Sequence, residues 1–74
     1  MSTAQLASIV ERNPNIQGGT PVFRGTRVPV QSFFDHLEAG ESIEDFLDGF
    51  QTVKRDQVIK LLEIYRAETL ALIA

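Results

Sequence analysis

Apolar residues recur with helical spacing in the middle of the chain, directly after Pro29. One helix face repeats at i, i+3, i+4 and i+7 in the residues Val30, Phe33, Phe34 and Leu37. Pro29 suits an opening turn, because its missing N–H would have no intrahelical partner there. Gly40 supplies a C-terminal stop, so the pattern predicts a first helix between Pro29 and Gly40.

Two further helices follow the first. Ser42 and Asp45 have capping-box spacing, with Asp in place of the usual Glu, and the helix they open should end near Gly49. Its apolar face is Ile43, Phe46, Leu47 and Phe50. After Gln51-Thr52, a third helix of roughly 20 residues carries one apolar stripe that persists toward the end of the chain. That stripe is Val58, Leu61, Leu62 and Tyr65, followed by Leu70, Leu72 and Ile73.

The aromatic residues fall on these helical stripes, a spacing that favours core packing over a platform for stacking nucleic-acid bases. They are Phe33, Phe34, Phe46, Phe50 and Tyr65.

The first third of the chain contains Pro14 and Gly18-Gly19, residues that favour loops and short strands over a helix. Ile9-Val10 is a candidate strand. Residues 22–28 read as a hairpin with a type II′ turn centred on Gly25-Thr26, in which glycine supplies the positive φ.

That hairpin register pairs Phe23 with Val28 and sets Arg24 directly opposite Arg27, where like charges are unfavourable. Arg24 and Arg27 are therefore candidate contacts for an anion, a phosphate or a carboxylate of a partner. The alternative is that both guanidinium groups turn into water at little cost.

The length of 74 residues allows one domain, with strands and a hairpin over 1–29 and a three-helix unit over 30–74. The absence of Cys excludes disulfides and thiolate metal sites, and the single His cannot form a zinc site alone. The sequence shows no signal-peptide pattern and no apolar run of membrane-spanning length. We therefore expect a soluble, cytoplasmic protein without a metal or other cofactor.

The net charge of −3 hides a division along the chain. Residues 1–30 hold three Arg and one Glu, net +2, whereas residues 31–74 hold four basic and nine acidic residues, net −5. The stretch from Asp35 to Asp48 contains six acidic residues and no Lys or Arg. Positive charge is confined to the first 30 residues and to the chain from Lys54 onward, and an anionic partner responds to this local field.

No catalytic constellation emerges from the sequence. Asp35 and His36 are helix neighbours that point about 100° apart, and Ser32 with His36 lacks a third group. The glycine pair does not precede Lys-Ser/Thr, which excludes a P-loop. We expect no enzymatic activity.

The start of the third helix carries the clearest candidate chemistry. A short helix, a five-residue connector and a longer helix can place the start of the longer one in the DNA major groove. Candidate DNA-binding residues there are Lys54, Arg55, Gln57 and Lys60. The alternative is an ordinary exposed helix start, although cations at that end oppose the helix dipole.

The stretches GGTPVFRGTRVPV, SFFDHLEAGESIEDFLDGF and TVKRDQVIKLLE resemble the domain-of-unknown-function family 433, DUF433, over roughly residues 9–63. The resemblance implies a mainly α fold with a small N-terminal β-hairpin and three helices in a homeodomain-like helix-turn-helix. The family motif covers Gly19, Pro21, Gly25, Thr26, Arg27, Pro29, Gly40 and Asp45. The chain has Phe50-Gln51-Thr52-Val53-Lys54 where many relatives have Phe-Pro-Thr-Val-Ser, so either Thr52 caps the third helix early or its start frays.

The resemblance further implies an antitoxin that neutralises a PIN-like nuclease toxin and binds operator DNA. A protein-interaction module without DNA binding is the alternative. We also expect a homodimer, because Leu70, Leu72 and Ile73 extend the apolar pattern beyond what a small three-helix core can cover.

Overall fold

The three predicted helices are present in the computed structural model, which describes residues 3–73, with side chains from Gln5 onward. The helix α2 spans Val30–Glu38, and extended backbone at Pro29 precedes it. Its end is a Schellman motif in which the Gly40 N–H donates to the Leu37 carbonyl and the Glu41 N–H donates to the His36 carbonyl. Gly40 has the positive φ, +85°, that this ending requires.

The helix α3 spans Ile43–Gly49 and begins with the predicted capping box. The Asp45 N–H donates to the Ser42 hydroxyl, and the Ser42 N–H donates to the Asp45 carboxylate, both at 3.1 Å. Asp therefore fills the position usually held by Glu.

The helix α4 spans Arg55–Ile73, and Gln57 closes its first turn. The Lys54 N–H donates to the Gln57 side-chain oxygen at 2.9 Å, which is the returning half of a capping box. From the sequence we expected either an early cap by Thr52 or a frayed helix start. The bond from Lys54 to Gln57 holds the first turn of α4 without either. The predicted stripe differs from the buried face at Tyr65, which is 58% exposed, and at Ile64, which the stripe lacks but which is buried with Val58 and Leu61.

The N-terminal third contains more regular structure than its composition suggests. The helix α1 spans Thr3–Ala7, so the expectation of only loops and strands is wrong there. The short strand β1 is Val10–Glu11, one residue beyond the predicted Ile9-Val10. A 3-10 turn, η1, spans Gln17–Gly19 with positive φ at all three residues.

The strand β2, Val22–Phe23, pairs antiparallel with β1, with Val10 opposite Phe23 and Glu11 opposite Val22. The small two-stranded sheet is thus confirmed, but its partner strand precedes β2 in the chain. On the other side of β2, Val22 forms an isolated bridge with Pro29, and the Phe23 N–H donates to the Val28 carbonyl.

The predicted type II′ turn at Gly25-Thr26 is wrong by one residue. The Thr26 N–H donates to the Phe23 carbonyl at 2.9 Å, so Arg24 and Gly25 are the central residues. The φ angle is negative at Arg24 and +80° at Gly25, the pattern of a type II turn. The shift also removes the predicted opposition of Arg24 and Arg27.

The core joins the two halves of the chain through three fully buried rings: Phe23 from β2, Phe33 from α2 and Phe46 from α3. Their centroids lie 5.0 to 6.3 Å apart, and Phe33 meets the other two edge-to-face. The residues Ile9, Val53, Val58, Leu61 and Ile64 complete the cluster.

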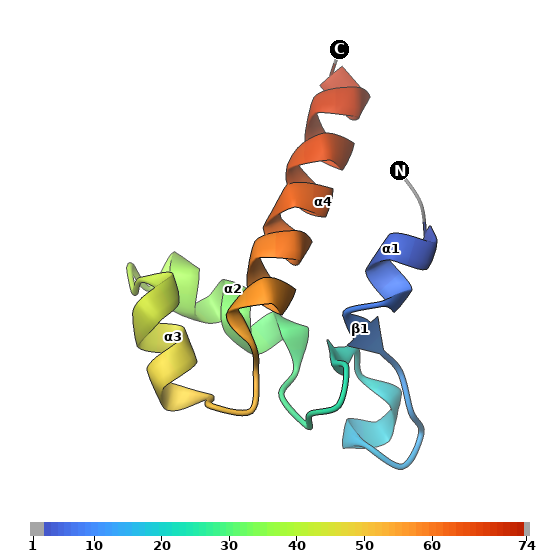
Figure 1. Cartoon of the computed structure of the whole chain (residues 1–74), viewed down its shortest axis with the longest axis vertical. Coiled ribbons are helices and arrows are strands. Elements are labelled where there is room, and N and C mark those ends of the chain that lie inside the picture. The colour runs from blue at the N-terminus through green and yellow to red at the C-terminus, as the bar shows by residue number, and fades with distance from the viewer. Residues whose placement is uncertain (1–2, 74) are drawn as a thin grey trace.

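The helix α4 rises from this core and its C-terminal end projects past the rest of the molecule, with α1 beside it (Figure 1). The chain is thus mainly helical, and the three helices predicted from the sequence correspond to α2, α3 and α4. Among residues 3–73, no helix combines the length and apolar character needed to cross a membrane.

Replacing Gly25 with Val should destabilise the protein by about 1–3 kcal/mol, because a β-branched residue is strained at positive φ. A Cβ at Gly25 would meet no atom within 4 Å, so the loss reports chiefly on the backbone conformation. Urea unfolding measures it. Gly49→Val is the matched control, since that site is equally open and its φ is not positive; equal stability of the two variants would contradict the turn assignment.

Candidate nucleic-acid interface

Thr26 fixes the shape of the turn between β2 and α2. Its side chain is nearly fully buried, and its hydroxyl donates to the Phe23 carbonyl at 2.8 Å while accepting from the Val28 N–H at 3.0 Å. These two bonds add to the Phe23 N–H to Val28 carbonyl bond that already crosses the turn. The backbone therefore leaves the turn with Arg27 exposed to solvent.

Arg24 ties the turn to the N-terminal segment. Its Nε donates to the Ala7 carbonyl at 2.8 Å and its Nη2 to the Val10 carbonyl at 3.3 Å. Glu11 lies 3.8 Å from Nη1 and also accepts the Gly25 N–H at 2.8 Å. The prediction of two opposed arginines holding an anion is wrong in geometry, because Arg24 is engaged within the chain; contact of Arg27 with an anionic partner stays a prediction.

Gln57 joins this turn to the start of α4. Its amide nitrogen donates to the Arg24 carbonyl at 3.0 Å, while its amide oxygen accepts from Lys54. The side chain proposed from the sequence to reach DNA thus holds two segments 33 residues apart in the chain. Base contact by Gln57 stays a prediction, and it would compete with these bonds.

The other candidate cations divide into paired and unpaired side chains. Arg55 donates to the Glu44 carboxylate of α3, and this hydrogen bond, followed by the opposite charge of Glu44, raises the pKa of Arg55. Among the described residues, Arg27, Lys54 and Lys60 are exposed and form no ion pair within 4 Å. We call these three residues the cation surface.

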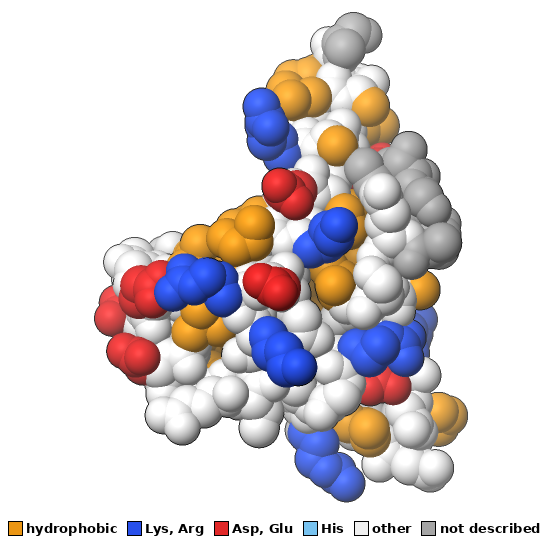
Figure 2. Space-filling model, in the orientation of Figure 1, with side chains coloured by type: hydrophobic (Ala, Val, Ile, Leu, Met, Phe, Trp, Pro, Cys, Tyr) orange, Lys and Arg blue, Asp and Glu red, His pale blue; other side chains and the backbone are white. Residues whose placement is uncertain are grey.

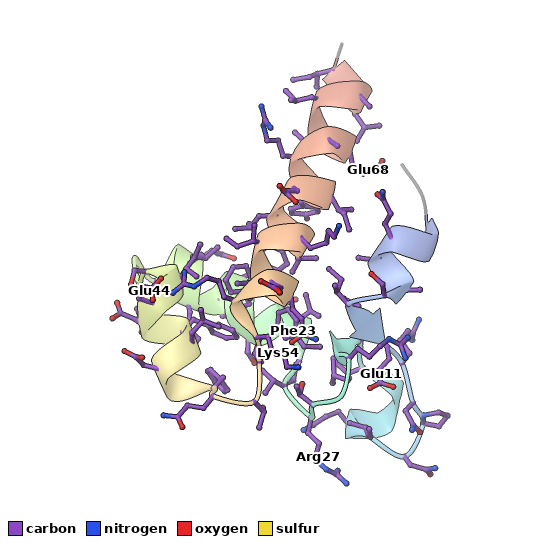
Figure 3. All side chains as sticks on the ribbon, viewed as in Figure 1. Glu11, Phe23, Arg27, Glu44, Lys54 and Glu68 are labelled. Atoms are coloured by element: carbon purple, nitrogen blue, oxygen red, sulfur yellow. The ribbon has the colours of Figure 1, made fainter. Side chains whose placement is uncertain are left out.

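Two residues of the cation surface, one from the turn and one from the start of α4, lie near each other. Arg27 and Lys54 are found at the same end, below the body of α4 (Figure 3). The space-filling view shows Lys and Arg side chains spread from the turn to α4 on that face, with single acidic groups between them (Figure 2). The Gln57–Arg24 bond links the turn to the start of α4, the two segments that carry these cations.

An open groove of about 700 Å³ adjoins Arg27. It runs between the turn and the α3–α4 connector, and Phe50 and Thr52 line its far side. Val28, Pro29 and Ile16 give it apolar walls. Glu11 and Arg27 line the same groove, so it carries one acidic and one basic side chain beside its apolar walls.

The predicted oligomer-interface residues are exposed at the projecting end of α4. Leu70, Leu72 and Ile73 are 50%, 83% and 77% exposed. Leu70 and Leu72 are two positions apart on a helix, so they point about 200° apart. One flat surface cannot bury both, as the spacing of the two positions along a helix already implies.

His36, considered as a catalytic residue from the sequence, packs against aromatic rings and a carboxylate. The ring of His36 packs edge-on against Phe46 and Phe50, and its Nδ1 lies 3.1 Å from a Glu41 carboxylate oxygen. Within residues 3–73, no three His, Cys, Asp or Glu side chains gather in a group that could hold a metal ion.

The fold and surface define a small, mainly helical protein whose short N-terminal sheet is locked to a three-helix unit. The chain belongs to the family described as protein of unknown function, DUF433, whose profile matches residues 10–65. It is 42% identical over 62 residues to the uncharacterized protein y4eO of Sinorhizobium fredii (strain NBRC 101917 / NGR234). The match covers 84% of this chain and 28% of that relative. No solved structure matches the chain.

The two arginines of the turn should respond differently to substitution. Arg24→Ala should lower the free energy of unfolding by about 1 kcal/mol, because it removes two exposed hydrogen bonds and a weak ion pair. Arg27→Ala should leave it nearly unchanged, since no bond within the chain is lost. Urea unfolding of both variants tests this assignment, and a greater loss for Arg27→Ala would reverse the two roles.

Proposed function

We propose that this protein is an antitoxin-type protein that binds operator DNA as a homodimer and neutralises a nuclease toxin through a separate surface. The DNA-binding part is carried by one observation, the cation surface of Arg27, Lys54 and Lys60. Unpaired cations on one rigid face suit the phosphate backbone, because neutralising phosphates releases condensed counterions.

The position of α4 supports an approach by its first turns. Lys54 immediately precedes the helix, and Lys60 follows about 1.7 turns later, so each can reach a phosphate from a different side of the helix start. Arg55 can contribute only if it leaves Glu44, which weakens its case as a primary contact. The acidic residues of the 35–48 stretch belong to α2, α3 and their connection, so DNA would approach from the α4 and turn side.

The toxin-binding part rests on the DUF433 motifs and on family membership. The groove beside Arg27 suits such a partner, since it combines apolar walls with an unpaired cation. The partner in this proposal is a PIN-like nuclease encoded beside this protein.

A protein-interaction module without DNA binding is the competing proposal. It is favoured by the pairing of Arg24 with Glu11 and of Arg55 with Glu44, which leaves fewer free cations than the sequence offers. The net charge of −3 points the same way. Both proposals keep the nuclease partner and differ only in DNA.

Replacing Lys54 and Lys60 together by Ala should weaken binding to the DNA upstream of the protein's own gene. The slope of log affinity against log salt should fall by about 1 to 2 units, because two phosphate contacts are lost. Fluorescence anisotropy over a salt series measures both quantities. Arg66→Ala is the control, since that exposed cation lies about 18 Å beyond Lys54 along the helix; no DNA binding by the parent protein would establish the interaction module instead.

The neutralising activity is tested separately, by titrating the purified neighbouring nuclease with this protein and following RNA cleavage. We expect cleavage to stop at a fixed molar ratio. Unchanged cleavage at excess protein would contradict the antitoxin proposal, whatever the DNA result.

A further inference from the structure

Two neighbouring cations at the start of α4 have different surroundings. Lys54 directly precedes the helix and belongs to the cation surface, whereas Arg55, the first residue of the helix, donates to the Glu44 carboxylate of α3. We call Glu44 and Arg55 the α3–α4 pair. A fourth cation therefore stands beside the cation surface, but an acidic side chain of the same protein already occupies it.

The α3–α4 pair joins two backbone segments that other contacts hold in place. Glu44 directly precedes Asp45, which forms the capping box of α3 with Ser42. Arg55 lies in the first turn of α4, which the Gln57 side chain closes. Because neither backbone segment must be ordered to form the pair, only the two side chains lose conformational freedom.

The position of Arg55 on its helix also favours the pair. The N-terminal end of a helix carries partial positive charge, which is unfavourable for a cation at the first position of α4. The Glu44 carboxylate offsets this effect, and its hydrogen bond and charge raise the pKa of Arg55. Arg55 loses this compensation if it leaves Glu44.

The pair directs Arg55 toward α3. Glu44 lies on α3, and Lys54 lies between Glu44 and Arg27 in the view of Figure 3. The Arg55 side chain therefore extends away from the turn that carries Arg27. Turning it toward DNA would leave the exposed Glu44 carboxylate unpaired near the phosphates, which repel it.

We infer that Glu44 withholds Arg55 from DNA and thereby lowers the affinity of this protein for DNA of any sequence, an inference that rests on the DNA-binding proposal above. For Arg55 to reach a phosphate, the α3–α4 pair must break and the Glu44 carboxylate must face the DNA. Lys54 and Lys60, which form no ion pair within 4 Å among the described residues, meet a phosphate without either loss.

The effect should not depend on DNA sequence. Phosphate contacts position a protein on the duplex but carry no sequence information themselves. One more free cation would strengthen binding to the operator and to every other duplex alike. Glu44 thus limits the sequence-independent part of the affinity by competing for Arg55.

Replacing Glu44 with Gln tests this role, because the amide is close in size to the carboxylate but carries no charge. We expect the affinity for the DNA upstream of the protein's own gene to rise about two- to fivefold, the contribution of an exposed ion pair. The slope of log affinity against log salt should steepen by about 1 unit, because one more phosphate is neutralised. An unrelated duplex of equal length should gain by the same factor. Fluorescence anisotropy over a salt series measures all three.

The same substitution in an Arg55→Ala background separates release of Arg55 from the loss of an acidic group. The net charge changes by the same amount there, but no cation is released. We expect the gain in affinity and the steeper salt slope to disappear in that background. Glu38→Gln is the second control, since Glu38 is exposed on α2 and forms no ion pair within 4 Å in residues 3–73.

The α3–α4 pair is also measured without DNA. In NMR spectra the Arg55 Nε–H signal should shift in Glu44→Gln and stay in place in Glu38→Gln. Circular dichroism and urea unfolding show whether each variant keeps the fold.

Three results would overturn the role of Glu44. They are an equal gain from Glu44→Gln with and without Arg55, an unshifted Arg55 signal, and a gain confined to the upstream DNA, which would make Arg55 a base contact. A parent protein that binds DNA together with a Glu44→Gln variant that gains nothing contradicts this role alone. Absence of DNA binding by both proteins contradicts the DNA-binding proposal and, with it, this role.

Discussion

The packing of Phe23, Phe33 and Phe46 is the contact on which the rest of the structure depends. Each ring comes from a different element, and all three are fully buried, so β2, α2 and α3 are positioned by one cluster. Aromatic side chains of this size supply much of the apolar area that a short chain can bury. Because Arg24 follows Phe23 directly, burying that ring also places the turn. The candidate interface is therefore a consequence of the core.

A second set of contacts joins the N-terminal segment to the helices at the surface. Arg24 binds the end of α1 and the strand β1, while its own carbonyl accepts from Gln57 of α4. The family match over residues 10–65 spans both sides of this junction. The two halves that the composition separates, a basic start and an acidic remainder, thus form one cooperative unit. The cations that stay free are those this junction does not use.

The sequence predicted the features that local signals control. The helix α2 and its glycine stop, the Ser42–Asp45 box and the positive φ at Gly25 each depend on residues within a few positions, and each is confirmed. The half-box formed by Gln57 was missed, although its spacing from Lys54 was available. The role of Arg24 was beyond reach, because its partners are 14 and 17 residues away and only the folded chain brings them near. The sequence placed Tyr65 rather than Ile64 in the core, because helical spacing alone does not show where along the helix the body of the protein ends.

The core of the protein covers α4 only as far as Ile64, and this affects where the backbone of the helix can open locally. Amides near Val58 and Leu61 lie over the core, so exposing them to exchange with solvent deuterium requires the whole chain to unfold. Amides beyond Ile64 belong to the part of α4 that has no buried side chain. In a single chain this part opens by fraying. Protection should therefore decline steeply along one continuous helix in a monomer. Slow exchange that persisted to its last turns would show that another surface covers it.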